Sequence, residues 1–147
     1  MIKPIVTEKR ELHKISTTAF FDSEHDKAAV HDLRDTAATL NNCAGLAAPQ
    51  IGHLVRIILV KVRGRVVIMI NPEIIERKGK LISGGEGCFS VPSSLKKPIR
   101  VRRCNKIRVQ WDDEQGCTNF ARFKSFEARL IQHEIDHLDG ILIGDKK

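Results

Sequence analysis

The sequence contains no tyrosine, one tryptophan and six phenylalanines among its 147 residues. With so few aromatic side chains, the core has to be built mainly from Ile, Val, Leu and Ala. Hydrophobic residues make up 41% of the chain, as in an ordinary globular protein, and the length suits one hydrophobic core. We therefore predict a single domain over residues 1–147.

Long apolar runs are also absent. No segment approaches the roughly 20 consecutive apolar residues of a membrane-spanning helix, and the start of the chain does not resemble a secretion signal. We therefore expect a cytoplasmic protein with no membrane partner. In a reducing compartment, the four cysteines (Cys43, Cys88, Cys104 and Cys117) favour metal binding or catalysis over disulfide bonds.

Positive charge is in excess, with 25 Lys and Arg against 18 Asp and Glu, a formal net charge of +7. Such a charge attracts polyanions but carries no information about the fold. The densest basic stretch runs from Lys96 to Arg103 and has the composition of a surface that faces RNA. Aromatic residues are not interleaved with the basic ones as base-stacking platforms would be. We therefore expect no sequence-specific nucleic-acid binding, and an RNA-binding protein without hydrolase activity is an alternative that rests on charge alone.

Hydrophobic periodicity predicts the first secondary-structure elements. Apolar residues recur at helical spacing over residues 23–42. Two β-branched runs at 55–60 and 66–70 flank a short loop that contains Gly64, which is typical of a β-hairpin. Asn71-Pro72 is expected to break the second run.

Two more strands and a final helix complete the prediction. Apolar and polar residues alternate over residues 107–111, which predicts a strand. A turn over 112–116 and a further strand through Phe123 are expected to follow. Ser125 is expected to cap a helix of about residues 126–139, which Gly140 ends. The expected buried side of that helix comprises Phe126, Leu130, Ile131, Ile135 and Leu138. This order of elements predicts an α+β domain.

The final helix carries the motif His133-Glu134-Ile135-Asp136-His137. Histidines four residues apart project from one helix face and can bind the same divalent cation. Glu134 beside them can take a proton from metal-bound water. Two polar histidines on a solvated face are the alternative, which the apolar residues on both sides of the motif disfavour. The motif therefore predicts a metal-dependent hydrolase.

A catalytic site of this kind usually needs a third protein ligand. Ile143 stands where the last histidine of His-Glu-x-x-His-x-x-Gly-x-x-His would be, and few residues follow it, so we expect the ligand upstream. The candidates are His13, His25, His31, His53 and the four cysteines. We favour Cys88, because the glycines at 84, 85 and 87 allow the backbone and its thiolate to approach a shared centre.

Three segments together resemble peptide deformylase. They are Cys-Ala-Gly-Leu-Ala-Ala-Pro-Gln at 43–50, Glu-Gly-Cys-Phe-Ser at 86–90 and Gln-His-Glu-Ile-Asp-His-Leu at 132–138. Their order and spacing match the family over about residues 27–143. The resemblance implies mixed or antiparallel β-sheets packed around a central C-terminal metal-binding helix, with an N-terminal helix.

The resemblance also implies an activity, which is removal of the formyl group from the N-terminal formylmethionine of nascent polypeptides. It implies Cys88, His133 and His137 as ligands of one divalent ion, usually Fe²⁺, which Zn²⁺, Ni²⁺ or Co²⁺ can replace. It further implies transient contact with the ribosome exit region, to which a basic surface would bind. The implied catalytic residues are Glu134 as the base, with the Gln50 side chain and the Phe89 backbone N–H as oxyanion donors. The implied substrate-binding residues are Gly45, Leu46, Glu86 and Gly87.

Departures and alternatives accompany the resemblance. Cys43 replaces the first glycine of the first segment, and Phe89 replaces the usual leucine, although the proposed donor is its backbone. Arg103 either pairs with Glu86 in the interior or lies on the surface, and Asp136 either orients a histidine or pairs on the surface. A metallopeptidase acting on internal bonds and a catalytically silent module with a structural metal are the competing interpretations.

Overall fold

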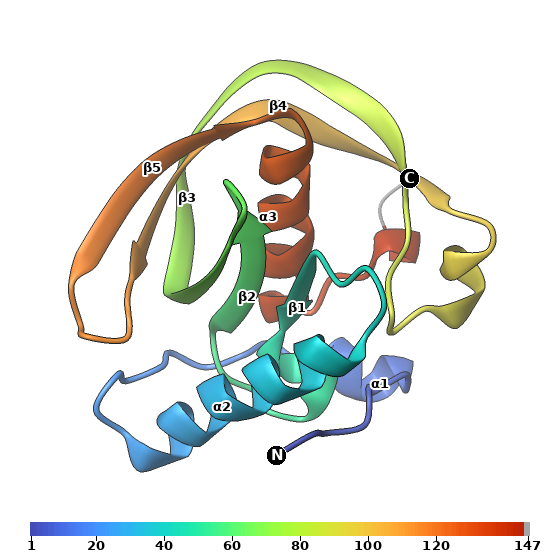
Figure 1. Ribbon diagram of the computed structural model, residues 1–147. Coiled ribbons are helices and arrows are strands. Elements are labelled where there is room, and N and C mark those ends of the chain that lie inside the picture. The colour runs from blue at the N-terminus through green and yellow to red at the C-terminus, as the bar shows by residue number, and fades with distance from the viewer. Residues whose placement is uncertain (146–147) are drawn as a thin grey trace.

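The computed structural model describes residues 1–145, and its last helix, α3 (Ser125–Leu138), lies beneath an arch of long β-strands (Figure 1). Residues 146 and 147 of the predicted domain lie outside the described residues. Ile131 and Leu138 of α3 are fully buried. They belong to one cluster with Ile58, Met69 and other side chains of the sheet. The helix that carries the metal-binding motif is therefore held at the centre of the fold by its apolar face.

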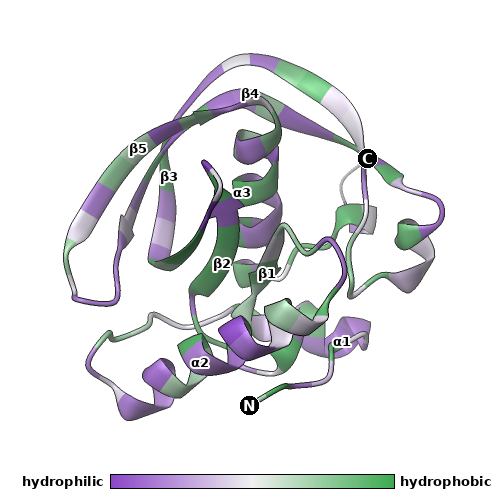
Figure 2. Ribbon diagram, viewed as in Figure 1, coloured by the Kyte–Doolittle hydropathy of each residue, from purple (hydrophilic) through white to green (hydrophobic). Residues whose placement is uncertain are grey.

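Within residues 1–145 the strands form one antiparallel sheet in the order β1-β2-β3-β4-β5. The strands are β1 (Gly45–Ala47), β2 (Ile57–Val62), β3 (Arg65–Glu86), β4 (Ile99–Asp112) and β5 (Thr118–Lys124). Most of β2 is hydrophobic (Figure 2), because it is covered on both of its faces. The predicted α+β class is confirmed.

The β2–β3 hairpin is confirmed, and it pairs Val62 with Arg65 around a turn in which Arg63 and Gly64 have positive φ. The expectation that Pro72 breaks the second run was wrong. β3 continues to Glu86, and its register with β4 shifts beside the proline. A proline has no N–H to give to the ladder, so the strand accommodates it at this irregularity.

Helix α2 (Glu24–Thr39) packs against β1 and β2 at one end of the sheet (Figure 1). Its N-terminus is capped by Ser23, whose hydroxyl accepts a hydrogen bond from the Asp26 N–H. Its buried residues form a second cluster with Leu46 of β1 and Ile57 of β2. The remaining helical segments are α1 (Lys9–Leu12) and three short 3₁₀ turns at Ala48–Ile51, Pro92–Leu95 and Ile143–Asp145. No helix within the described part of the chain is long and apolar enough to span a membrane.

The ends of α3 differ in part from expectation. The predicted Ser125 cap was wrong, since the helix begins at Ser125 and no side chain caps it. Phe126, expected on the buried side, is 63% exposed because it lies at the rim of the cavity described below. The stop at Gly140 is confirmed by its φ of 73°. A Cβ there would also lie 2.4 Å from the His13 carbonyl oxygen, so only glycine fits.

Ile131→Ala tests how far α3 depends on its packing. Ile131 is fully buried, so the substitution leaves a cavity and should lower the free energy of unfolding by about 2–5 kcal/mol. Leu81→Ala is the control, because Leu81 is 63% exposed and its loss should cost less than about 0.5 kcal/mol. Urea denaturation measures both. Equal effects of the two substitutions would contradict the central position of α3.

Candidate metal centre

Three potential metal ligands converge below the arch of the sheet. His133 and His137 lie one turn apart on α3, and Cys88 follows the end of β3. Their ligand atoms all lie within 4.8 Å of one another, and Cys88 Sγ is 3.4 Å from His137 Nε2. All three residues are buried. No other such group of His, Cys, Asp or Glu occurs among residues 1–145. The structure thus brings together the two predicted histidines and the favoured cysteine, and leaves the other candidates elsewhere.

The surroundings of the two histidines favour a cation between them. Burial lowers the pKa of His133, but Glu134, Cys88 and Glu86 outweigh burial and raise it to about 10. Burial and the charge of His133 hold the pKa of His137 well below its ordinary value. The site therefore attracts positive charge and offers a neutral imidazole as a ligand. One thiolate and two imidazoles suit Zn²⁺, Fe²⁺, Ni²⁺ or Co²⁺, so the residues present fit a divalent cation.

Glu86 connects this centre to the rest of the protein. Its carboxylate accepts hydrogen bonds from Arg103 at 2.7 and 2.8 Å, from His133 Nδ1 at 2.9 Å and from Arg129 at 2.5 Å. Arg103 is 2% exposed and also donates to Asp136 at 2.7 Å. Of the alternatives left open by the sequence, Arg103 lies in the interior against Glu86, and Asp136 pairs with this buried guanidinium.

The ionised form of the Glu86 carboxyl group is strongly favoured. Burial raises its pKa, but hydrogen bonds from His133 and Arg103 lower it further, to about 2. Because Glu86 occupies Nδ1 of His133, the other ring nitrogen, Nε2, is left to face the centre. Such a bond fixes the orientation of a metal-ligating histidine.

Gln50 lies beside the three ligands and is 2% exposed. Its Oε1 accepts a hydrogen bond from the Ala47 N–H at 2.9 Å. This bond determines the orientation of the amide. Nε2 then donates to Ser90 Oγ at 3.1 Å and lies 3.6 Å from Cys88 Sγ. The side-chain amide therefore presents its N–H groups to the centre.

Glu134 is 3% exposed, and its Oε1 has no hydrogen-bond partner among residues 1–145. Burial raises its pKa to about 7, against the opposing charges of His133 and Arg103. A Cβ on Gly45 would lie 2.8 Å from Glu134 Oε2 and 2.8 Å from Leu130 Cδ1. The glycine in the first segment is therefore needed to leave room for the carboxylate.

Eight of the ten predicted site residues line one open cavity of about 570 Å³. They are Gly45, Gln50, Glu86, Gly87, Cys88, Phe89, His133 and Glu134. His137 is 1% exposed and does not reach the cavity surface. The side chain of Leu46 is fully buried in the core, so only its backbone is available to a ligand. Cys43 is also buried, and its thiol donates to the Gly45 carbonyl at 3.4 Å.

Sequence reasoning missed two residues that support the centre. Ser94 is 1% exposed, and its hydroxyl accepts a hydrogen bond from the Cys88 N–H at 2.8 Å, which fixes the backbone of the cysteine. No pattern in the sequence pointed to it. Arg129 precedes His133 by one helical turn, so its position on the same face of α3 was available from the spacing.

Comparison with known proteins assigns the fold and site to a family. The family model described as polypeptide deformylase matches residues 2–147. The chain is 44% identical over 144 residues to the peptide deformylase of Dictyoglomus thermophilum, covering 93% of this chain and 92% of the relative. It is 37% identical to peptide deformylase 1 of Bacillus subtilis over 150 residues, covering 99% of this chain and 89% of that relative.

The chain belongs to the peptide deformylase family. A Met-Ala-Ser-bound crystal structure of a class I type b peptide deformylase from Acinetobacter baumannii has the same fold, with a TM-score of 0.89 and 30% identity over 99% of both chains. The predicted resemblance and the prediction of an enzyme are confirmed. The Cys-His-His cluster, together with family membership, indicates one metal ion.

Cys88→Ala tests the sulfur ligand. We expect metal content to fall from about one ion per chain to less than about 0.2, since two imidazoles alone do not make a stable site. Cys104→Ala is the matched control and should keep the wild-type content, because Cys104 lies outside the cluster. Elemental analysis of protein prepared without oxygen measures both. Full metal content in Cys88→Ala would refute the ligand assignment.

Glu86→Gln tests the buried carboxylate. Because it leaves the Arg103 guanidinium buried and underpaired, the free energy of unfolding at pH 7 should fall by about 3–5 kcal/mol. Glu76→Gln removes a more exposed pair with Lys78 and should cost less than about 1 kcal/mol. Denaturant titrations of the wild type and the two variants measure these losses of unfolding free energy.

The stability that the Glu86–Arg103 ion pair contributes depends on pH in a defined way. The pKa of Glu86 is about 2 in the folded chain against an ordinary 4.5, so its stabilisation is complete above pH 4.5 and is lost as pH falls through 2. The difference in the free energy of unfolding between the wild type and Glu86→Gln should therefore shrink by about 3 kcal/mol as the pH falls from 4.5 to 2. A difference independent of pH would contradict the ionised pair.

Proposed function

We propose that this chain removes the formyl group from the N-terminal formylmethionine of nascent polypeptides and releases formate. The observation that carries the proposal is the convergence in one cavity of three metal ligands, a buried carboxylate and an oriented side-chain amide. Membership of the peptide deformylase family supports the same reaction. Under this proposal residues 1–147 act as a single catalytic domain.

Cys88, His133 and His137 would hold the divalent cation. Fe²⁺ is the ion we expect in the cell, and Zn²⁺, Ni²⁺ or Co²⁺ suit the same donor set. When bound, the cation lowers the pKa of a water molecule toward neutrality and polarises the formyl oxygen. The bond from Glu86 to His133 Nδ1 keeps the imidazole turned toward that position.

Glu134 serves as the general base and then as the general acid. Its buried Oε1, which has no partner in the described structure, accepts the proton of the attacking water. A new C–O bond forms at the formyl carbon while the formyl C–N bond breaks. Glu134 then returns the proton to the amine that leaves, so formate and a free N-terminus are the products.

Gln50 and Phe89 stabilise the oxygen of the formyl group as it becomes negative. Gln50 Nε2 is preoriented because Ala47 holds the other end of the amide. The backbone N–H of Phe89 has no hydrogen-bond partner among residues 1–145 and lies in the cavity wall. A preorganised donor of this kind typically contributes about 3 kcal/mol to the transition state.

The substrate backbone binds along β1 as an added strand. β1 is an edge of the sheet, so Gly45 and Leu46 offer backbone groups to an extended peptide. Glu86 and Gly87 form the opposite side of the cavity. The bound tripeptide in the Acinetobacter baumannii relative, Met-Ala-Ser, is what deformylation of formyl-Met-Ala-Ser would leave, and it supports an N-terminal peptide as the ligand.

We further infer that the enzyme works in the cytoplasm, in transient contact with the ribosome exit region through a basic surface. The support is the formal net charge of +7, which favours encounter with a polyanionic particle.

Glu134→Gln tests the chemistry. Formate release from formyl-Met-Ala-Ser should fall at least about 100-fold in kcat/KM, while metal content stays at the wild-type level because Glu134 is not a ligand. Glu127→Gln changes a glutamate on the same helix outside the cavity and should keep full activity. A coupled formate assay and elemental analysis measure the two quantities.

Two outcomes would overturn the proposal. Unchanged turnover in Glu134→Gln would exclude Glu134 as the base. Cleavage of unformylated peptides at internal bonds by the wild type, with no formate released, would identify a peptidase instead.

A further inference from the structure

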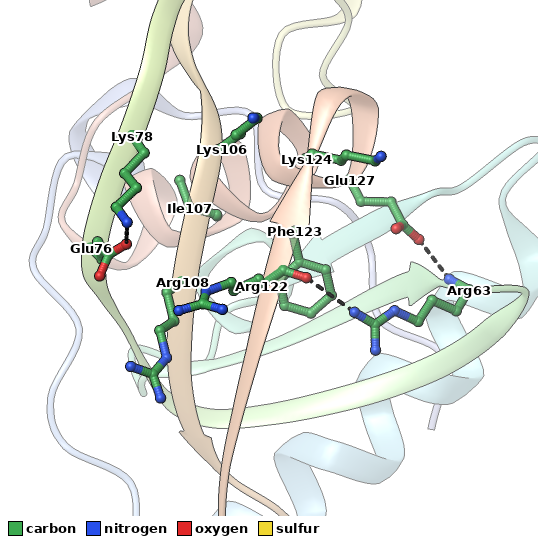
Figure 3. Close-up of a pocket in the computed structure, with 10 residues that line it drawn as sticks. All are labelled: Arg63, Glu76, Lys78, Lys106, Ile107, Arg108, Arg122, Phe123, Lys124 and Glu127. Carbon is green, nitrogen blue, oxygen red and sulfur yellow. Dashed lines mark hydrogen bonds and ion pairs between the residues drawn. The ribbon is translucent and has the colours of Figure 1, made fainter.

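The structure has a second open groove, of about 540 Å³ (Figure 3). It runs over β3, β4 and β5, the tip of the β2–β3 hairpin and the first turn of α3. It shares no lining residue with the cavity that contains the candidate metal ligands. Six Lys or Arg and two Glu line it, an excess of four positive charges. More than half of the chain's net charge of +7 is therefore concentrated here.

Sheet register arranges five of these cations in two rows. Lys78, Lys106 and Lys124 are direct cross-strand partners on β3, β4 and β5. In the next row, Arg108 and Arg122 are direct partners, and both appear side by side in Figure 3. Directly paired residues project from the same side of a sheet, with their Cβ atoms about 5 Å apart. The result is a compact array of like charges.

The two glutamates offset only part of this charge. Glu76 pairs with Lys78 at 2.9 Å and lies directly opposite Arg108. Glu127 accepts a hydrogen bond from the Arg63 backbone N–H at 2.6 Å. Five cations of the groove form no ion pair in the described structure: Arg63, Lys106, Arg108, Arg122 and Lys124. Like charges directly opposite one another destabilise a sheet, so an anion bound over Lys106, Lys124, Arg108 and Arg122 would relieve their repulsion.

We propose that this array binds the phosphate backbone of RNA. Ammonium and guanidinium groups are the side chains that pair with phosphate oxygens, and arginine does so with two parallel hydrogen bonds. The proposal deepens the proposed function, on which it rests, because a nascent polypeptide is presented on an RNA-rich particle.

An exposed aromatic ring favours RNA over an acidic protein. Phe120 of β5 is 54% exposed, and the guanidinium of Arg108 lies 5.6 Å from its ring centroid. An exposed ring beside a cationic row is a platform on which a base can stack, whereas a carboxylate-rich peptide gains nothing from it. β5 is thus an exception to the expected separation of aromatic and basic residues, with Phe120, Arg122, Phe123 and Lys124 close in sequence.

The basic stretch expected from the sequence is less suited to this role. Arg103 at its end is buried against Glu86, and Arg100 donates to Ser83 on the neighbouring strand. Lys96 and Lys97 remain exposed and provide a matched control.

The test measures binding of a labelled single-stranded RNA of about 16 nucleotides to the metal-loaded protein by fluorescence anisotropy. For about four phosphate contacts, affinity should fall about 50-fold between about 50 and 200 mM salt. The double variant Lys106→Glu/Arg122→Glu should bind at least about 10-fold more weakly, with a shallower salt dependence. Lys96→Glu/Lys97→Glu makes the same change in net charge and should bind within about twofold of the wild type.

The double variant should fold at least as well as the wild type, because each new glutamate faces a cation, Lys124 or Arg108, across the ladder. Its melting temperature should equal or exceed that of the wild type, so weaker RNA binding cannot come from unfolding. Formate release from formyl-Met-Ala-Ser should stay unchanged, since the groove is separate from the cavity. This readout distinguishes failure of the RNA site from failure of the proposed activity.

Three results would overturn the RNA site. They are equal losses in the two double variants, affinity independent of salt, and displacement of the RNA by polyglutamate at the same concentration of charge. The last would identify an acidic protein surface as the partner.

Discussion

The buried carboxylate of Glu86 is the interaction on which the metal centre depends. It lies at the end of β3, where it meets two arginines and His133 of α3. Arg103 reaches it from β4 and Asp136 from α3 completes the network. A guanidinium buried to this degree is tolerated only when its charge is matched. The same bonds that satisfy it also join the sheet to the helix, and they leave Nε2 of His133 facing the sulfur of Cys88.

Two small features complete the geometry around that network. Ser94 fixes the Cys88 backbone with its hydroxyl, and Ala47 fixes the amide of Gln50. The absence of a side chain at Gly45 leaves space for Glu134. Each of these contacts restricts a group before any ligand arrives, which is the condition for effective electrostatic catalysis. The catalytic cavity is thus preorganised by contacts between segments far apart in the chain.

The basic groove shows a different balance between stability and function. Around Glu86, each buried charge has a partner, whereas the rows on β3, β4 and β5 place several cations opposite cations. A sequence that specifies one fold normally avoids such conflicts, and they concentrate where a protein binds something. The two regions are separate, so changes of charge on the outer strands need not disturb the chemistry. The enzyme therefore combines a paired ionic network in its interior with an excess of positive charge on its outer strands.

Short-range patterns in the sequence determined α3, the β2–β3 hairpin and two of the metal ligands, because helical spacing and turn chemistry act over a few residues. The same reasoning failed at Pro72, Ser125 and Phe126. There the pairing of β3 with β4 and the open cavity outweighed local preference. Cys88 and Gln50 were identified through motifs, but their approach to the histidines depends on the sheet. Only the tertiary structure decided that Arg103 is buried, that Ser94 and Arg129 support the centre, and that five cations form one array. These features depend on strand register and on contacts across the chain, and no local pattern encodes them.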